Sequence, residues 1–218
     1  MVNPSNEDLL TEWCKWMLQQ AGPTDTSNDW KAGTIVQTEN ENGSQKYHND
    51  IWFIPGTWGD VLIPDRDQVK VPFGRKLFVI AGSSHVTPPE LPNGTPNTPA
   101  NLKAQLAKID ALWLSPSVHV GPTVDKLAPV ALTRVETSAP IQVNINAGSK
   151  YTVLTKGNGQ AGVSGNQDMM ASASVCTVNL ARGDTFITIA GQSRKDETTG
   201  SRGEKEYNVH VRYKITVR

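Results

Sequence analysis

The sequence predicts an all-β protein, an antiparallel β-sandwich of jelly-roll type with two short helices. Short β-rich runs separated by Pro and Gly begin at residue 51, and the C-terminal segment 207–217 alternates apolar and polar residues without error. Only two segments show helical spacing. At 218 residues the chain can bury a substantial core, so we expect a single domain over 1–218.

The N-terminal segment 1–22 is expected to form an amphipathic helix that packs on the sandwich. Ser5 and Asp8 match an N-cap residue and its N3 partner, and Gly22 marks the end of the segment. Five apolar residues recur between them at helical spacing: Leu9, Leu10, Trp13, Trp16 and Met17. A second helix is expected at about 100–110, where three apolar residues share one face.

The strand-like runs are joined by three conspicuous connections. Residues 83–99 are rich in proline and predict an extended, exposed loop. Residues 157–174 are rich in Gly, Asn and Ser, and residues 192–206 carry mixed charges and predict a loop between the last two strands. The strand-like runs are IWFIPG, DVLIP, QVKVPFG, RKLFVIAG, LWLSPSVHV, VALTRVE, PIQVNINAG, KYTVLTK, DTFITIA and YNVHVRYKITVR.

Composition excludes several classes of partner. Lys plus Arg and Asp plus Glu both number 21, and this zero net charge argues against nucleic acid as a partner. No apolar run approaches the length of a membrane span, so we expect no membrane insertion. The first residues lack the features of a signal peptide, although a virion or an extracellular surface is the favoured location.

The two cysteines, Cys14 and Cys176, lie far apart and form no CxxC motif. Two buried free thiols are favoured over one long-range disulfide.

Five stretches, taken in order, resemble a known family. They are EWCKWML at 12–18, IWFIPGTWG at 51–59, VPFGRKLFVIAG at 71–82, ARGDTFITIAG at 181–191 and NVHVRYKITV at 208–217. They are similar to those of a family of mostly secreted, uncharacterised bacterial and archaeal proteins with WFLAGT-like and VPAGKALFFP-like strands. The resemblance implies a β-rich fold and no particular activity. Family members carry cysteines around the first strands, whereas this chain has none between 15 and 175.

Acidic residues and an RGD tripeptide are candidate binding sites. Asp60, Asp65 and Asp67 could together bind calcium, although a solvated turn balanced by Arg66 explains them more simply. Residues 182–184 read RGD, so Arg182 and Asp184 could face a partner from a hairpin tip. The favoured interpretation is a tight turn in which both side chains are exposed.

Catalytic patterns are weak. His48, His85, His119 and His210 are scattered without metal-ligand spacing, and His85 beside Ser83 and Ser84 is the best candidate for nucleophilic chemistry. GNGQAG at 157–162 matches the G-x-G-x-x-G pattern, but the residues after it do not favour the helix that a dinucleotide site needs.

Tryptophans provide the remaining functional signal. Trp52 and Phe53 lie among apolar neighbours and are expected in the core, whereas Trp58 and Trp30 could stack on sugar rings. The sequence favours a non-catalytic structural or interaction protein in a homo-oligomer or larger assembly, such as a virion coat, a decoration layer or a cell-surface layer. A carbohydrate-binding module is the alternative, and a metal-dependent or hydrolytic enzyme is the second.

The carbohydrate alternative predicts that the chain binds at least one glycan on an array and that Trp58→Ala abolishes the binding, because the flat indole face supplies the stacking surface. Trp52→Phe, a change in the expected core, should keep the binding. Glycan binding that survives Trp58→Ala, or no binding by the native chain, contradicts this alternative.

Overall fold

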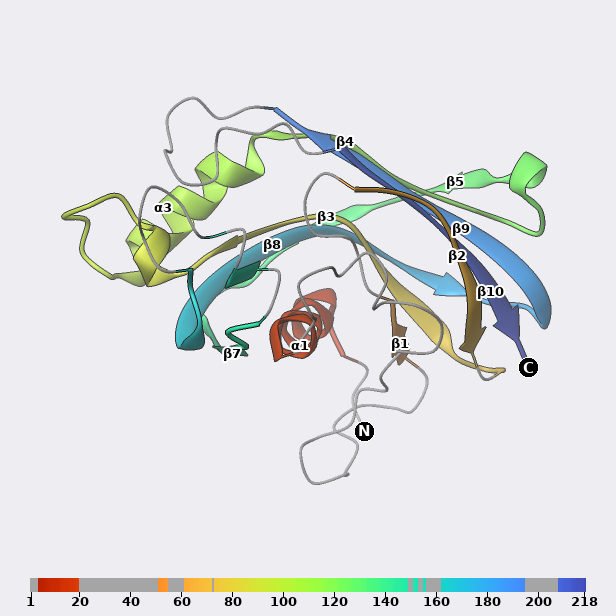
Figure 1. The fold of residues 1–218 in the computed structure, drawn as a ribbon, viewed down its shortest axis with the longest axis horizontal. Coiled ribbons are helices and arrows are strands. Elements are labelled where there is room, and N and C mark those ends of the chain that lie inside the picture. Colours follow the sequence, from red (N-terminus) through yellow and green to blue (C-terminus); the bar gives the residue numbers. More distant parts are fainter. Residues whose placement is uncertain are drawn as a thin grey trace, which may run out of the picture.

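The computed structural model describes residues 4–19, 51–54, 61–71, 73–148, 151–152, 155, 162–194 and 208–218, without the side chains of 61–70 and 208–209. These residues form two five-stranded sheets and two α-helices, α1 and α3 (Figure 1). The prediction of a mostly β protein with two helices is confirmed. We call the sheet that contacts α1 the inner sheet and the other the outer sheet.

The inner sheet is built around a long antiparallel pair. β3 (Lys76–Val86) pairs with β8 (Gly165–Asn179), and β1 (Ile51–Phe53) lies parallel to β3 at one edge. β6 (Thr133–Glu136) and β7 (Ile141–Ile145) follow one another along the opposite side of β8. β8 therefore has strand partners on both sides at residues 172–175, whereas β7 alone pairs with its start and β3 alone with its end.

The outer sheet has the order β2, β10, β9, β4, β5. β9 (Gly183–Ser193) and β10 (Asn208–Val217) pair antiparallel, as the sequence predicts for the last two strands. β4 (Trp113–Gly121) joins β9 to the short edge strand β5 (Ala128–Val130). The parallel pairs β2/β10 and β1/β3 show that the expectation of a wholly antiparallel sandwich is wrong.

Helix α1 (Asn6–Gln19) begins with the predicted cap. Ser5 Oγ accepts from the Asp8 N–H at 3.1 Å, and Asp8 Oδ2 accepts from the Ser5 N–H at 2.9 Å. The apolar stripe of the helix is buried against the inner sheet in the helix core, which also contains Phe53, Phe78 and Met169. Trp13 Nε1 donates to the Ile54 carbonyl at 3.3 Å and ties the helix to β1.

The opposite face of the inner sheet is covered in two parts. Most of it packs against the outer sheet in the inter-sheet core, where Val79 and Val178 meet Ile189 and Tyr213. The far end packs under α3 (Pro99–Asp110) in a smaller third core. The centre of the inner sheet, formed by β1, β3 and residues 169–176 of β8, is thus buried on both faces, whereas β6 and β7 have exposed residues.

The short strand β1 is buried on both faces, and its successive residues alternate between the two cores. Ile51 and Phe53 belong to the helix core, whereas Trp52 and Ile54 belong to the inter-sheet core. Because successive strand residues point to opposite faces, a run of four apolar residues is required here. The predicted core positions of Trp52 and Phe53 are confirmed.

Two strands extend beyond their predicted limits. β3 continues through Val86, so the proline-rich loop begins at Thr87 rather than at 83. β8 begins at Gly165, inside the segment 157–174 that composition assigned to a connection. Its continuous run of small and apolar residues lacks a period of two because both faces are buried.

Two further local expectations are wrong. The run 150–156 is not a strand where it is described, because the Thr155 N–H donates to the Tyr151 carbonyl at 2.9 Å in a helical turn. The region around Asp65 and Asp67 is part of one strand, β2 (Val61–Val71), rather than a turn. β2 lies at a sheet edge and has two register shifts against β10, which accommodate Pro64.

The two cysteines lie on opposite sides of the inner sheet. Cys14 is in the helix core and Cys176 is in the inter-sheet core, and both are free and buried. Burial raises the pKa of the Cys14 thiol and raises that of Cys176 to about 11. The preference for two buried free thiols is confirmed.

We predict that Ellman's reagent titrates two thiols after denaturation without any reductant, and none rapidly in the native protein. The raised pKa values keep both groups in the unreactive thiol form at neutral pH, and the thiolate of Cys176 should form only as the pH approaches 11. Cys176→Ala should lower the denatured count to one. A denatured count of zero before reduction would show a disulfide and contradict the two-sided placement.

Candidate functional site

A cluster of polar side chains lies in the seam between the outer sheet and α3, on the face of the inner sheet that both of them cover. Alternate residues of β8 point to this face, so Cys176 in the inter-sheet core is followed by Ser174 and Ser172 and then by Met170 under α3. Both serines are buried, as is Ser84 on the neighbouring strand β3. Buried hydroxyls require hydrogen-bond partners within the protein.

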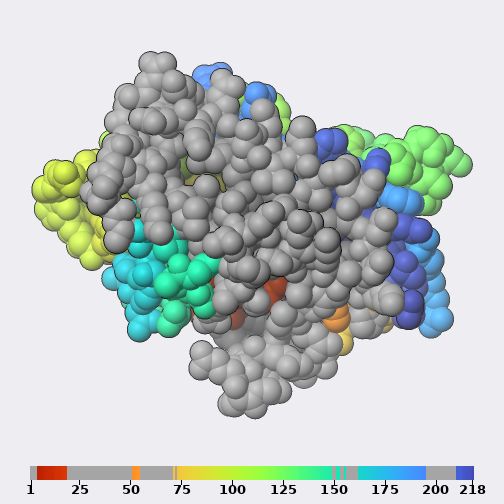
Figure 2. Space-filling view, viewed as in Figure 1, coloured from red at the N-terminus to blue at the C-terminus, as the bar shows by residue number. Residues whose placement is uncertain are grey.

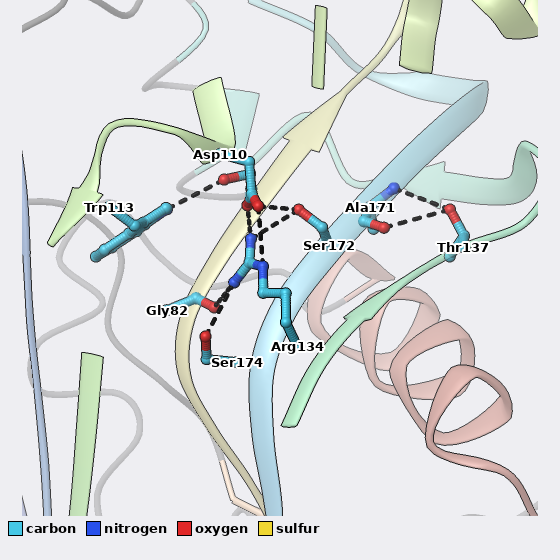
Figure 3. Close-up of polar contacts among 9 residues, drawn as sticks. Gly82, Asp110, Trp113, Arg134, Thr137, Ala171, Ser172 and Ser174 are labelled. Carbon is cyan, nitrogen blue, oxygen red and sulfur yellow. Dashed lines mark hydrogen bonds and ion pairs between the residues drawn. The ribbon is translucent and has the colours of Figure 1, made fainter. Parts of the chain in front are cut away.

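Arg134 is the centre of this cluster (Figure 3). Its Nε donates to Asp110 Oδ2 at 2.9 Å, and its Nη1 donates to the Gly82 carbonyl at 3.3 Å and to Ser174 Oγ at 3.2 Å. Its Nη2 donates to Ser172 Oγ at 2.8 Å and forms an ion pair with Asp110. Ser172 Oγ in turn donates to Asp110 Oδ1 at 2.6 Å. The guanidinium thereby joins β6, β8, β3 and the end of α3.

The Asp110–Arg134 pair is partly shielded from water, since the two side chains are 26% and 34% exposed. Burial lowers the pKa of Arg134 to about 10, against the opposing effect of the Glu136 charge. The guanidinium therefore stays protonated at neutral pH. The two carboxylate oxygens of Asp110 are occupied by Arg134 and by the Ser172 hydroxyl, so the carboxylate is held within the cluster. This geometry suits a structural clamp.

Trp113 closes the seam at the start of β4. Its indole Nε1 donates to Ser84 Oγ at 3.1 Å. Its ring lies against a glycine from each sheet: a Cβ on Gly82 or on Gly191 would come within 3.2 Å of ring carbons. The two glycines thus leave room for the indole between the sheets.

His85 lies on the other side of the inner sheet from this cluster. The ring is 2% exposed and packs between Trp13, at 6.3 Å between centroids, and Tyr151, at 6.1 Å. Tyr151 Oη donates to Glu90 Oε2 at 2.5 Å. Because Ser84 points toward Trp113, the adjacent pair His85 and Ser84 cannot act as base and nucleophile on one face of the strand.

The RGD residues form an exposed corner at the start of β9. The predicted tight turn is wrong, because Gly183 and Asp184 are already paired with Val217 and Thr216 of β10 and because β8 and β9 lie in different sheets. Gly183 has a φ of 103°, which a glycine adopts without strain, and Arg182 and Asp184 are exposed as expected. The Arg182 guanidinium lies 4.5 Å from the centroid of the Phe73 ring. Asp184 accepts from Thr216 Oγ1 at 2.8 Å and pairs with Lys214 at 3.2 Å, and these contacts lower its pKa, with the Thr216 hydrogen bond first.

The other predicted site residues are not brought together in the described part of the chain. Trp30, Trp58, Asp60 and His48 lie outside it, as does most of the G-x-G-x-x-G segment 157–162. Asp65 and Asp67 are on the β2 backbone, and their side chains are not described. Within the described residues, no group of three or more His, Cys, Asp or Glu side chains could hold a metal ion.

His119 and His210 both lie on the outer face of the outer sheet. His119 is paired with Thr188, which is paired in turn with Arg212, two residues beyond His210. Two strand spacings and a two-residue offset place the two histidines about 12 Å apart. They are too distant to share a proton or a metal ion directly.

Comparison with known proteins adds no relationship. No known protein family, curated protein or solved structure matches the chain. None of the helices in the described ranges has the length and apolar character needed to cross a membrane.

No motif in the sequence points directly to the Asp110–Arg134 clamp. Asp110 is the last residue of a helix and Arg134 lies on an edge strand, 24 positions further along the chain. The signal that could have found them was the run MMASASVC, because serines within a buried strand demand polar partners. It was missed because the run was assigned to a connection.

We predict that Asp110→Asn lowers the free energy of unfolding by about 1 to 3 kcal/mol, since it leaves the partly buried Arg134 cation without its carboxylate. Denaturant titration measures this change. Combining it with Arg134→Met should cost less than the sum of the two single changes, with a coupling of about 1 to 2 kcal/mol.

Lys103→Met is the matched control for that measurement. Lys103 pairs with Glu136 at 3.1 Å, but the side chains are 60% and 39% exposed, so its loss should cost less than about 1 kcal/mol. Equal effects of Asp110→Asn and Lys103→Met would contradict the clamp.

Proposed function

We propose that the protein is a non-catalytic structural or interaction protein that associates with further copies of itself in a surface assembly, such as a virion coat, a decoration layer or a cell-surface layer. The observation that carries the proposal is the exposed corner formed by Phe73, Arg182, Asp184 and Arg218, which we call the Phe73 corner. Phe73 is 54% exposed, the most exposed large apolar side chain of the described surface.

The Phe73 corner has the composition of a protein contact. Aromatic and arginine side chains are enriched at protein interfaces and often carry most of the binding energy. The stack between Arg182 and Phe73 fixes both side chains before binding, which lowers the entropy lost on contact.

The corner is also held firmly to the sandwich. The Phe73 N–H donates to the Arg218 carbonyl at 2.7 Å, and the Arg218 N–H donates to the Val71 carbonyl at 3.1 Å. These bonds tie the turn before β3 to the end of β10. A rigid, partly apolar surface favours binding without much rearrangement.

The balance of charge supports self-association over binding to a polyanion. Positive and negative side chains are equal in number, so copies of the chain repel one another weakly. The jelly-roll arrangement that the strand spacing favours remains part of this proposal, because jelly rolls recur in viral coat domains and in lectins. The calcium site at Asp60, Asp65 and Asp67 remains a prediction, and no step depends on it.

We predict that light scattering of the chain at about 100 μM gives a mass above the 23.7 kDa of one copy, as expected for contacts of micromolar affinity. Phe73→Ser should weaken association about tenfold or more, because it removes the aromatic anchor. Val124→Ser is the control, since Val124 is also apolar and 44% exposed but lies on the η2 turn (Val124–Lys126). A native chain that stays monomeric at this concentration contradicts the proposed function.

A further inference from the structure

We propose that the Phe73 corner of one copy receives the proline-rich loop 87–98 of the next copy, so that copies join head to tail. This inference rests on the proposed function and names the surface that the corner binds. The loop leads into α3 at one end of the longest axis of the molecule, and the chain end beside the corner lies at the other end (Figure 1). Figure 2 shows residues of the loop and of β9 and β10 at these opposite ends.

The loop is braced by its own hydrogen bonds. At its start, the Thr87 N–H and Oγ1 both donate to Glu90 Oε2, at 2.9 and 2.8 Å. In its middle, the Thr95 N–H donates to the Pro92 carbonyl at 2.9 Å. At its end, Asn101 Nδ2 donates to the Pro96 carbonyl at 2.9 Å, and Thr98 Oγ1 caps α3. Little conformational entropy remains to be lost when such a loop binds.

The outward surface of the loop lacks charge. Residues 91–102 contain no Asp, Glu, Lys or Arg, although these make up 19% of the chain. Glu90, the charged residue nearest to this stretch on its N-terminal side, has its carboxylate bound by Thr87 and the buried Tyr151. Pro92, Asn93, Pro96 and Asn97 are exposed. Depletion of charge is a mark of the central part of a protein interface.

The two surfaces are chemically complementary. Proline rings pack well on aromatic side chains, as in the aromatic grooves that bind proline-rich segments. The exposed ring of Phe73 offers such a surface, and the arginines beside it offer donors to the side-chain carbonyls of Asn93 and Asn97. A short loop on one corner makes a small contact, so we expect affinity in the micromolar range or weaker.

Head-to-tail contact differs in its consequence from a two-fold dimer. Each copy carries one proline-rich loop and one Phe73 corner. A chain of copies therefore always has an unbound loop at one end and an unbound corner at the other, unless it closes into a ring. The geometry therefore points to open chains or rings of copies. A two-fold interface would instead stop at a pair.

The experiment uses charge at Asn97 and the purified full chain. Asn97→Arg should weaken association at least tenfold, because it places a cation opposite Arg182 and Arg218, and Asn97→Glu should strengthen it at low salt. A change that merely disturbed the loop would weaken association in both variants. Thermal melting of each variant checks that the fold is retained.

Mixing two variants then tests the direction of the contact. Phe73→Ser keeps the loop and loses the corner, whereas Asn97→Arg keeps the corner and loses the loop. Each alone should give a mass closer to that of one copy than the native chain does at the same concentration, and an equimolar mixture should form mainly dimers. If the native chain associates but neither Asn97 variant changes its mass, or if the mixture stays monomeric, the head-to-tail contact is wrong and the proposed function stands. A monomeric native chain overturns both.

Discussion

The centre of the inner sheet, in β1, β3 and residues 169–176 of β8, is buried on both faces, and most other features of the fold depend on that constraint. A strand without a solvent face needs a small or apolar residue at every position, and β8 meets this need with Ala171 and Ala173 toward α1 and with Ser172 and Ser174 toward the seam. The serines are small enough for the layers to approach, but their hydroxyls must be satisfied inside the protein. Arg134 and Asp110 supply those partners, so the polar clamp is a consequence of the double burial.

The contacts that we propose between copies lie at the ends of the molecule, away from this centre. The polar groups of the seam are bound to one another, and the two cysteines are held in the cores as unreactive thiols. At the two ends, the chain exposes a charge-free loop braced by its own hydrogen bonds and an arginine-rich corner with an exposed aromatic ring. Rigid surfaces of complementary chemistry on a sandwich-like scaffold are the basis of the proposed assembly role.

The sequence predicts best those helices and strands whose apolar residues recur with a regular period. α1 and β10 each have one solvent-facing side and one buried side. Their apolar residues therefore recur with the helical or the two-residue period, which is visible in the sequence. Residues 169–174 of β8 show no period of two because both faces of the strand are buried there, and the prolines after β3 hide the end of that strand. Arg134 and Asp110 could not be paired in advance, because their contact depends on which strands lie beside β8. The exposure of Arg182 and Asp184 follows from the sequence, but the contact of Arg182 with Phe73 depends on the distant turn before β3.

Native-state hydrogen exchange tests the central role of the inner sheet most directly. If burial on both faces makes β3 and β8 the most stable unit, the amides of residues 77–80 and 170–176 should exchange only through global unfolding, with a free energy equal to that from denaturant titration. The amides of the edge strands β5 and β7 should exchange earlier through local opening. Exchange of the β8 amides at the rate of those edge strands would contradict the account.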